Sequence, residues 1–533
     1  MSVDAPEPGD ARMFPFVIPW DDASESVANV SRWNEKPAGK HGAVRVRSGH
    51  FADGRGRRLR FFGTNLCFAG CFPPHEVAER VAARMAKFGI NIVRFHHMDS
   101  RPFPSGILDP ARQDKQHLSA EALDRLDYLI HQLKLNGIYA NINLHVSRKL
   151  GEADGIQQAD AMPRMDKGVD NFHPRMIELQ RKYARDLLTH VNPYTGNAYT
   201  DEPAVAMIEL NNENSLTTLW RRGELDALPE YCQAMLDDRW HEWLRARRRD
   251  TESIREAWSE GASPLGHEML RNRDFGDGID EWTLEVHAPA AATAQPVPGG
   301  PHGKPAMQIT ITDPNDTGWY VQFHQSGLDF EDAAPYTFEF WARAEPDRSL
   351  SVNNFAAREP WHSLGFQGNA EIGSEWRQYS FGFRASETYT GGRVGFGDLA
   401  RIEGTLWIAD VSLRPGGVRG LREGESLEAH AIPRPRRRDM AGCSPPLQRD
   451  YVQFLLAVER EYWTGMAECL RAELGVKSLI TGAQMGYTPI QTHAAMDYFD
   501  AHAYWRHPWF PGKPWDSNNW WVTNESMVSA SGG

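Results

Sequence analysis

The stretch Ala204–Ser215 holds the residues best suited to chemistry. It opens with an apolar run and turns polar at Asn212-Glu213-Asn214, a pattern typical of a buried strand that ends abruptly. A carboxylate at such an end lies in a low dielectric, which raises its pKa, and the flanking amides can hold a substrate hydroxyl. The same residues also suit a polar strand end that caps a helix, and the pattern alone leaves both interpretations open.

The elements that must position Glu213 repeat one order: a helix, a glycine and an apolar strand. In the first unit, a helix over His75–Phe88 ends at Gly89 and the strand Ile90–Phe95 follows. In the second, a helix after the N-cap Ser119 ends at Gly137, before the strand Ile138–Leu144. In the third, a helix that starts at Pro445 ends at Gly475, before the strand Val476–Ile480. This order is typical of βα units that build a parallel sheet. It predicts an α/β fold, and a (β/α)8 TIM barrel is preferred to a doubly wound sheet because no glycine-rich phosphate loop follows the first strand.

Between the fourth and fifth predicted strands the pattern changes to an all-β one. Runs of alternating polar and apolar residues lie between Gly, Pro and Asp turns, namely Met307–Ile311, Trp319–Phe323, Tyr336–Trp341, Trp376–Phe381 and Leu406–Ser412. They predict an inserted β-sandwich of domain size. The expected domains are a β-hairpin collar over 1–57 that begins with a strand at Phe14–Trp20, a first barrel part over 58–267, the sandwich over 268–416 and a second barrel part over 417–533. The six barrel strands begin at Leu59, Ile90, Ile138, Val205, Val476 and Tyr498.

The amino-acid composition limits the kinds of partner that the chain can be expected to bind. The 533 residues are 41% hydrophobic and 24% charged, as in a globular protein, and the 18 Trp suggest flat apolar platforms on which sugar rings stack. A net charge of −13 argues against nucleic acid, and no apolar run approaches the length that spans a membrane. No basic and apolar leader begins the chain, so a cytoplasmic location is expected, or a secreted or periplasmic one if a leader precedes Met1. The five Cys are scattered without metal-ligand spacing.

Several strand ends, taken together, resemble a known family. The run Leu187–Pro203 into the Asn-Glu strand is similar to clan A glycoside hydrolases close to family 5, whose fourth strand carries the acid/base. Four further matches are Gly63-Thr-Asn65 at strand one, Arg94 at strand two, His145 at strand three and His502-Ala-Tyr504 at strand six. All five lie where barrel active sites gather, at the C-terminal ends of strands. The inserted segment resembles jelly-roll carbohydrate-binding modules of the CenC type at its opening, Leu270–Trp282, and its close, Trp407–Leu413.

The resemblance implies a retaining glycosidase of β-linked poly- or oligosaccharides. Glu213 is then the acid/base, and Asn212 holds the sugar 2-hydroxyl. Arg94 orients the nucleophile, His145 reaches the sugar, and Tyr504 donates a hydrogen bond to the nucleophile. The other expected substrate-binding residues are His502 and Trp505, the latter in an aromatic loop. No cofactor is expected, and a structural calcium in the β-sandwich is left open.

The second carboxylate is where the sequence departs from the family. It is expected from a seventh strand, and the chain is expected to stop before strands seven and eight, so that 1–533 by itself would be an inactive fragment. Glu209 is predicted to be a buried member of a structural ion pair. Glu525 is the last carboxylate, but no buried strand precedes it.

Two other classes of function stay open. A metal-dependent barrel hydrolase is suggested by four histidines near strand ends, His96, His97, His145 and His502, although the first strand ends in Gly63-Thr-Asn65 instead of the usual His-x-His. A non-catalytic glycan-binding protein is suggested by the missing nucleophile.

Overall fold

The computed structural model describes residues 19–483, 486–504, 506–523 and 525. The chain forms two compact units, one of Met1–Met235 with Leu455–Gly533 and one of Leu236–Phe454. The division falls within two helices, α5 (Glu230–Arg245) and α7 (Pro445–Glu468). None of the helices in the described part of the chain is both long and apolar enough to cross a membrane.

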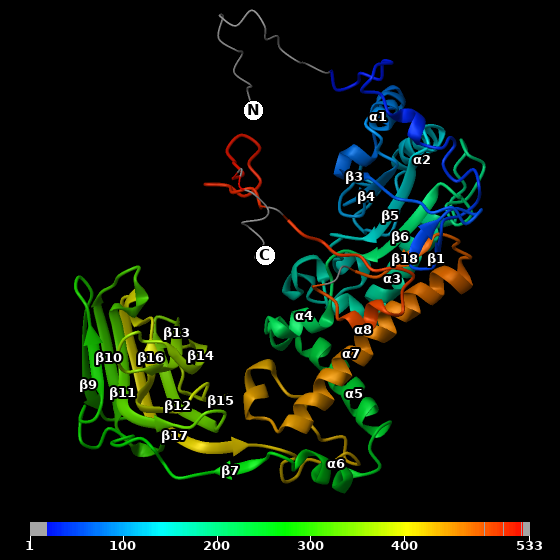
Figure 1. Ribbon diagram of the computed structural model, residues 1–533. Coiled ribbons are helices and arrows are strands. Elements are labelled where there is room, and N and C mark those ends of the chain that lie inside the picture. Colours follow the sequence, from blue (N-terminus) through cyan, green and yellow to red (C-terminus); the bar gives the residue numbers. More distant parts are fainter. Residues whose placement is uncertain (1–18, 484–485, 505, 524, 526–533) are drawn as a thin grey trace, which may run out of the picture. The chain divides into compact units, whose positions relative to one another are not determined.

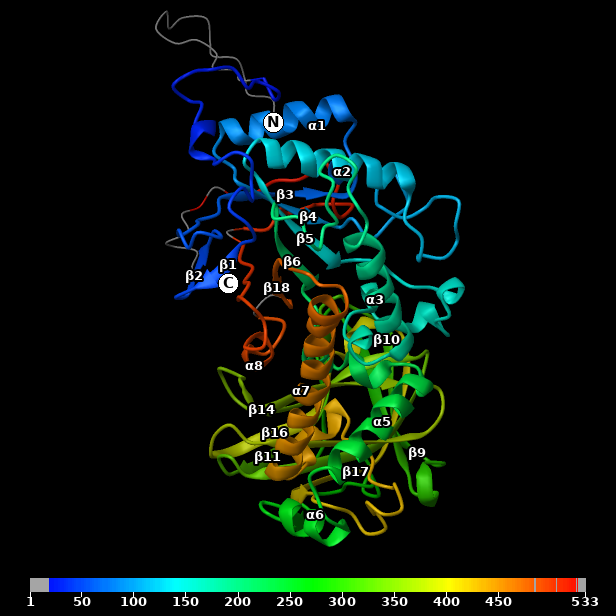
Figure 2. The same ribbon diagram turned by 90° about the vertical axis from the view of Figure 1, so that its right-hand side faces the viewer.

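The first unit is built on a five-stranded parallel sheet (Figures 1 and 2). The strands are β3 (Gly63–Cys67), β4 (Ile92–His96), β5 (Tyr139–His145), β6 (Val205–Asn211) and β18 (Leu479–Thr481), in the order β18-β6-β5-β4-β3. Their order across the sheet follows their order along the chain and never reverses, whereas a doubly wound sheet reverses at a switch point. The fold is thus mixed α/β, and a closed barrel is not formed by the described residues, because β3 and β18 each have one neighbour.

Helices alternate with these strands as the repeat predicts. They are α1 (His75–Lys87), α2 (Ala120–Leu135) and α3 (Pro174–Leu188), and α1 and α2 lie side by side in both views. The hydroxyl oxygen of Ser119 accepts a hydrogen bond from the Ala122 N–H, which confirms the predicted N-cap. Gly89, Gly137 and Gly475 have φ of 79°, 75° and 73°, so each predicted glycine stop is confirmed by a backbone conformation that favours glycine.

The core of this unit lies between the sheet and its helices. Strand residues such as Val93, Ile142 and Ile208 are fully buried with Leu126 and Leu187 of the helices. All seven residues of β6 are buried, including the polar side chains of Glu209 and Asn211. A strand buried on both faces must provide partners for its own polar groups, which is why β6 is the centre of the polar networks described below.

Two sequence predictions for this unit need correction. The sixth strand, expected over Tyr498–Tyr504, is wrong: the segment forms no named strand, although the Asp497 N–H donates to the Ile480 carbonyl at 3.0 Å. The strand next to this segment, β18, has only three residues, so it offers few backbone groups with which a sixth strand could pair. The predicted collar contains one hairpin, β1 (Arg45–Arg47) with β2 (His50–Ala52), while most of its expected first strand, Phe14–Trp20, lies outside the described residues.

The second unit contains two antiparallel sheets. One has the order β15-β12-β17-β10-β9, with β7 paired to β17, and the other has the order β14-β13-β16-β11-β8. The strands are β7 (Ser263–Leu265), β8 (Thr283–Val286), β9 (Ala291–Val297), β10 (Ala306–Asp313), β11 (Val321–Phe330), β12 (Pro335–Glu345), β13 (Arg348–Ala356), β14 (Ser363–Ile372), β15 (Arg377–Arg384), β16 (Tyr389–Gly397) and β17 (Gly404–Val418).

These sheets face each other across a shared core. The rings of Phe338 on β12 and Phe396 on β16 are 5.7 Å apart between centroids, and both are buried. The unit is therefore a β-sandwich, as predicted. One predicted strand, Trp319–Phe323, begins late, because Gly318–Tyr320 form a 3-10 turn and β11 starts at Val321. The other α-helices in the described part of the chain are α4 (Leu216–Arg221), α6 (Thr251–Trp258) and α8 (Ile490–His493).

Candidate functional site

A cavity of about 530 Å³ lies in the first unit at the carboxyl ends of β4 and β6. His96 ends β4, and Asn212 and Glu213 directly follow β6. The lining residues are His96, His97, Pro163, Arg164, Met165, Lys167, Asn212, Glu213, Ser215, Thr218, Leu219, Arg222, Glu224, Tyr487, Tyr504, His507 and Trp515. The edge of a parallel sheet where strands end is where ligand sites form in α/β proteins.

The helix-cap interpretation of the Asn212-Glu213-Asn214 turn is confirmed at the next residue, Ser215, while the role of Glu213 in chemistry stays a prediction. Ser215 is the helix cap: its hydroxyl oxygen accepts the Thr218 N–H at 3.1 Å and begins α4. Glu213 lines the cavity, and its backbone φ of 47° lies in the left-handed region, which is unfavourable for a residue with a side chain. Such strain, of about 1–3 kcal/mol, persists where the surroundings hold it and gathers at functional sites.

Glu213 belongs to a group that we call the cavity-side cluster, made of Glu213, His502 and Asp500. His502 Nδ1 is 3.0 Å from Glu213 Oε1, and its Nε2 is 3.4 Å from Asp500 Oδ2. The carboxylates of Asp500 and Glu213 raise the pKa of His502 to about 9, so the ring is an imidazolium at neutral pH. The hydrogen bond from His502 in turn lowers the pKa of Glu213 despite partial burial. The sequence predicted a raised pKa for Glu213, and that prediction is wrong.

A second network connects β4, β5 and β6 behind Asn212. Arg94 donates to both carboxylate oxygens of Glu209, at 2.9 and 2.7 Å, and to Asn212 Oδ1 at 3.0 Å. Glu209 is completely buried, so the predicted structural ion pair is confirmed. Burial raises the pKa of Glu209, and the bidentate Arg94 opposes this shift. Arg94 therefore orients the side chain of Asn212 at the cavity wall.

The same network fixes a histidine on the cavity wall. Asn143 Nδ2 donates to Glu209 Oε2 at 2.8 Å, which leaves Asn143 Oδ1 to accept from His96 Nδ1 at 2.7 Å. Burial lowers the pKa of His96 to about 3, so its ring is neutral and Nε2 is left as an acceptor.

His145 is not brought into the cavity. Its side chain is 3% exposed and lies in what we call the sealed cluster, with Asp99 Oδ2 3.4 Å from Nδ1 and Asp170 Oδ2 3.2 Å from Nε2. Burial favours the neutral ring, but the carboxylates of Asp170 and Asp99 outweigh it and raise the pKa of His145 to about 9. The predicted contact of His145 with a sugar is thus corrected, because both ring nitrogens face buried carboxylates.

The sealed cluster instead supports the turn that carries Glu213. Asn211 Nδ2 and Asn214 Nδ2 both donate to Asp170, and Asn214 Oδ1 accepts the Gly168 N–H at 2.7 Å. The His145 carbonyl accepts the Asn212 N–H at 2.8 Å. Residues on both sides of Glu213 are therefore anchored in buried polar contacts, which holds its unfavourable backbone conformation.

Aromatic residues form part of the cavity wall. Tyr504 and Trp515 line it, and the Tyr504 ring is 4.1 Å from that of His507. Trp505, predicted to bind substrate, lies outside the described residues. Glu525 is exposed, forms an ion pair with Arg506 and is not among the residues that line the cavity.

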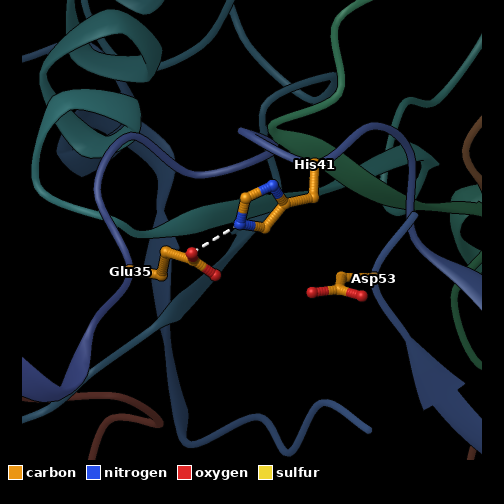
Figure 3. A group of neighbouring side chains, drawn as sticks. All are labelled: Glu35, His41 and Asp53. Carbon is orange, nitrogen blue, oxygen red and sulfur yellow. Dashed lines mark hydrogen bonds and ion pairs between the residues drawn. The ribbon is translucent and has the colours of Figure 1, made fainter. Parts of the chain in front are cut away.

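Two groups of side chains have the composition of a metal site, and in each of them an arginine already bonds to a carboxylate. Glu35, His41 and Asp53 gather near the β1–β2 hairpin (Figure 3), where His41 Nε2 is 2.5 Å from Glu35 and Arg57 bonds both carboxylates. The other group is Glu209, Asp500 and His502, and Arg94 neutralises Glu209 there. A metal ion would have to displace an arginine in either place. In the described part of the chain, His96, His97 and His145 join neither group.

Sequence analysis did not identify three residues of this site. Asp500 is the second partner of His502, and its spacing two residues before that histidine was the available signal. Lys167 and Arg164 also line the cavity, but they come from the irregular segment between β5 and α3, where no strand or helix pattern marks a position.

The chain resembles parts of known proteins. No protein-family model matches it. Mannan endo-1,4-beta-mannosidase 3 of Oryza sativa subsp. japonica is 28% identical over 168 residues, which cover 30% of this chain and 34% of that protein. The chain thus spans about a third of the length of the curated relative it matches.

Solved structures also resemble part of the chain. The second N-terminal cellulose-binding domain of Cellulomonas fimi β-1,4-glucanase C is 19% identical with a TM-score of 0.24, covering 29% of this chain and 98% of that one. The N-terminal cellulose-binding domain of the same enzyme is 21% identical with a TM-score of 0.22, covering 30% and 99%.

Proposed function

We propose that this chain belongs to a glycoside hydrolase that cleaves β-linked glycans with Glu213 as acid/base. The observation that carries the proposal is a carboxylate at the end of β6, next to an oriented Asn212, on the wall of an open cavity with Tyr504 and Trp515. The similarity to a mannan endo-1,4-beta-mannosidase supports this and makes mannan oligosaccharides the first substrates to try.

The chemistry starts from a shared proton. At neutral pH the imidazolium of His502 lies 3.0 Å from Glu213, so the pair holds one proton between two basic groups. A sugar that fills the cavity excludes water from Glu213, which favours its protonated form and prepares it to protonate the leaving oxygen. The resulting carboxylate then activates water, which is the second task of an acid/base in a retaining mechanism.

A retaining mechanism also needs a nucleophilic carboxylate about 5–5.5 Å from the first. Its identity remains a prediction. Two described carboxylates near Glu213 are Glu224, which lines the cavity, and Asp500, which lies across His502. Replacing each by its amide and looking for loss of a trapped glycosyl adduct would identify or eliminate them.

We further propose that the parallel sheet is part of a (β/α)8 barrel. The strand order without reversal supports this, because consecutive parallel neighbours are what a barrel contains. An experimental structure with a further parallel strand on the free edge of β3 would bear this out. A strand added there antiparallel would contradict it.

The acid/base assignment is tested by Glu213→Gln. We expect it to lower kcat on mannan oligosaccharides by about 10²–10⁴, because it removes the proton donor. Aryl glycosides, whose leaving groups need less protonation, should lose less in the first step. Hydrolysis of oligosaccharides near the wild-type rate would contradict the assignment. Tight binding of the oligosaccharides by the wild type and by Glu213→Gln, with hydrolysis by neither, would favour the glycan-binding alternative.

For the second unit we propose a carbohydrate-binding module. The outer face of the β8-β11-β16-β13-β14 sheet has polar side chains that are almost buried, Ser351 and Asn353, beside Gly395 and Gly397 of β16. Half-exposed Trp361 lies 5.4 Å from the guanidinium of Arg393 near this face.

Trp361→Ala should weaken retention on insoluble mannan or cellulose roughly tenfold. The control is Trp376→Ala at the start of β15 in the other sheet, and equal loss in both variants would contradict the proposal.

A further inference from the structure

The cavity wall of the first unit carries more fixed positive charge than negative. Three of its residues are basic, Arg164, Lys167 and Arg222, while Glu213 and Glu224 are its carboxylates. The whole chain has a net charge of −13, so composition alone predicts the opposite sign. A cationic cavity in an acidic protein concentrates anions from solution.

Two of these cations have no anion of their own. Glu213 is engaged by His502, and Arg222 lies 4.0 Å from Glu224 in an exposed pair. In the part of the chain that the structure describes, the Arg164 guanidinium and the Lys167 ammonium make no hydrogen bond or ion pair. Arg164 is exposed at the wall and Lys167 is half-buried.

Lys167 is held in place by its neighbours in the chain. Asp166 is buried, accepts the Leu150 N–H at 2.7 Å and forms an ion pair with Lys149 at 2.8 Å. Gly168 has φ of 82° and donates its N–H to Asn214. A side chain at Gly168 would also meet Leu219 at 2.8 Å, so this backbone fits closely. The backbone that carries Lys167 is therefore held in place beside the cavity.

We infer that the cavity accepts a glycan that carries an anionic group, a carboxylate or a sulfate ester, bound beside Lys167 and Arg164. This inference rests on the proposed function and names its substrate class. An ammonium that is partly removed from water regains its lost solvation from a bound anion, and a guanidinium at the mouth can bind the same oxygens.

The anion would also act on Glu213. Burial lowers the pKa of Lys167, and the charge of Lys167 is one of the causes that lower the pKa of Glu213, after the hydrogen bond from His502. A bound anion offsets that positive charge. Its arrival thus favours the protonated form of Glu213 at the time when the proton is needed.

The experiment compares three oligosaccharides of equal length and linkage: a neutral one, one with a uronic acid and one with a sulfate ester. Binding is measured by calorimetry with the whole chain carrying Glu213→Gln. We expect an anionic form to bind about tenfold or more tightly than the neutral form, as for a hydrogen bond to a charged group. Which anionic ligand binds better distinguishes carboxylate from sulfate, and the preference should weaken at high salt.

In the same background, Lys167→Met should remove the preference, Arg164→Met should reduce it, and Lys167→Arg should keep most of it. The matched control is Lys477→Met, which removes an exposed lysine paired with Asp201 and should change nothing. Equal binding of neutral and anionic ligands, or a preference that survives Lys167→Met, overturns the inference and leaves the proposed function standing. Failure of every glycan to bind overturns both.

Discussion

Two regions of the first unit use the same chemistry with opposite access to solvent. In the sealed cluster His145 lies between Asp99 and Asp170, and in the cavity-side cluster His502 lies between Asp500 and Glu213. Carboxylates raise the pKa of both histidines to about 9. The side chain of His145 is 3% exposed and that of His502 is 19% exposed.

The difference in access assigns different tasks to the two clusters. The partners of His145 hold the chain around it. Asp99 accepts hydrogen bonds from the N–H groups of Val146, Ser147 and Arg148. Asp170 accepts them from the side chains of Asn211 and Asn214, on either side of Glu213. One partner of His502 is Glu213 itself, on the cavity wall. Where water is excluded, the histidine between two carboxylates holds backbone in place. Where substrate can enter, we propose that it supplies a proton.

The largest expected effect comes from breaking the sealed cluster. His145→Leu leaves two buried carboxylates without their cation, and breaking a buried charge pair costs about 3–5 kcal/mol. The free energy of unfolding, read from native-state hydrogen exchange of the β5 and β6 amides, should fall by that amount. The matched change is His502→Leu, which should cost about 1 kcal/mol or less, because its partners can be solvated. Equal costs would show that access does not separate the clusters.

Sequence patterns predicted well where most of the strands end, and poorly which side chains solvent can reach. Helix spacing, Ser119 and the glycine stops identified α1, α2, β4 and β5, because these signals are local. The sixth strand failed because strand pairing depends on a neighbour, and β18 is short. A run of apolar residues at Tyr498 does not reveal that.

The site residues divide in the same way. Asn212, Glu213, Tyr504 and His502 follow apolar runs, and the structure brings them to one cavity or its border. His145 also follows such a run, but the buried Asp99 and Asp170 that enclose it come from distant turns. Lys167 was missed because it lies in a loop without hydrophobic periodicity. Only the three-dimensional structure assigns it to the cavity wall.

The smallest expected effect concerns the protonation of His502. The folded-state pKa of about 9 lies above the ordinary value of 6.5, so its contribution to stability is complete below about pH 6.5 and is lost as the pH rises through 9. In an NMR titration of the histidine rings, Asp500→Asn and Glu213→Gln should each lower the midpoint of His502 by about one pH unit, since each removes an adjacent negative charge. The ring of His145, whose partners are untouched, serves as the control in the same spectra. A His502 midpoint that is already near 6.5 in the wild type would mean that the ring is neutral at the cavity. The proton that we assign to the Glu213–His502 pair would then be absent, and the two clusters would differ in charge as well as in access.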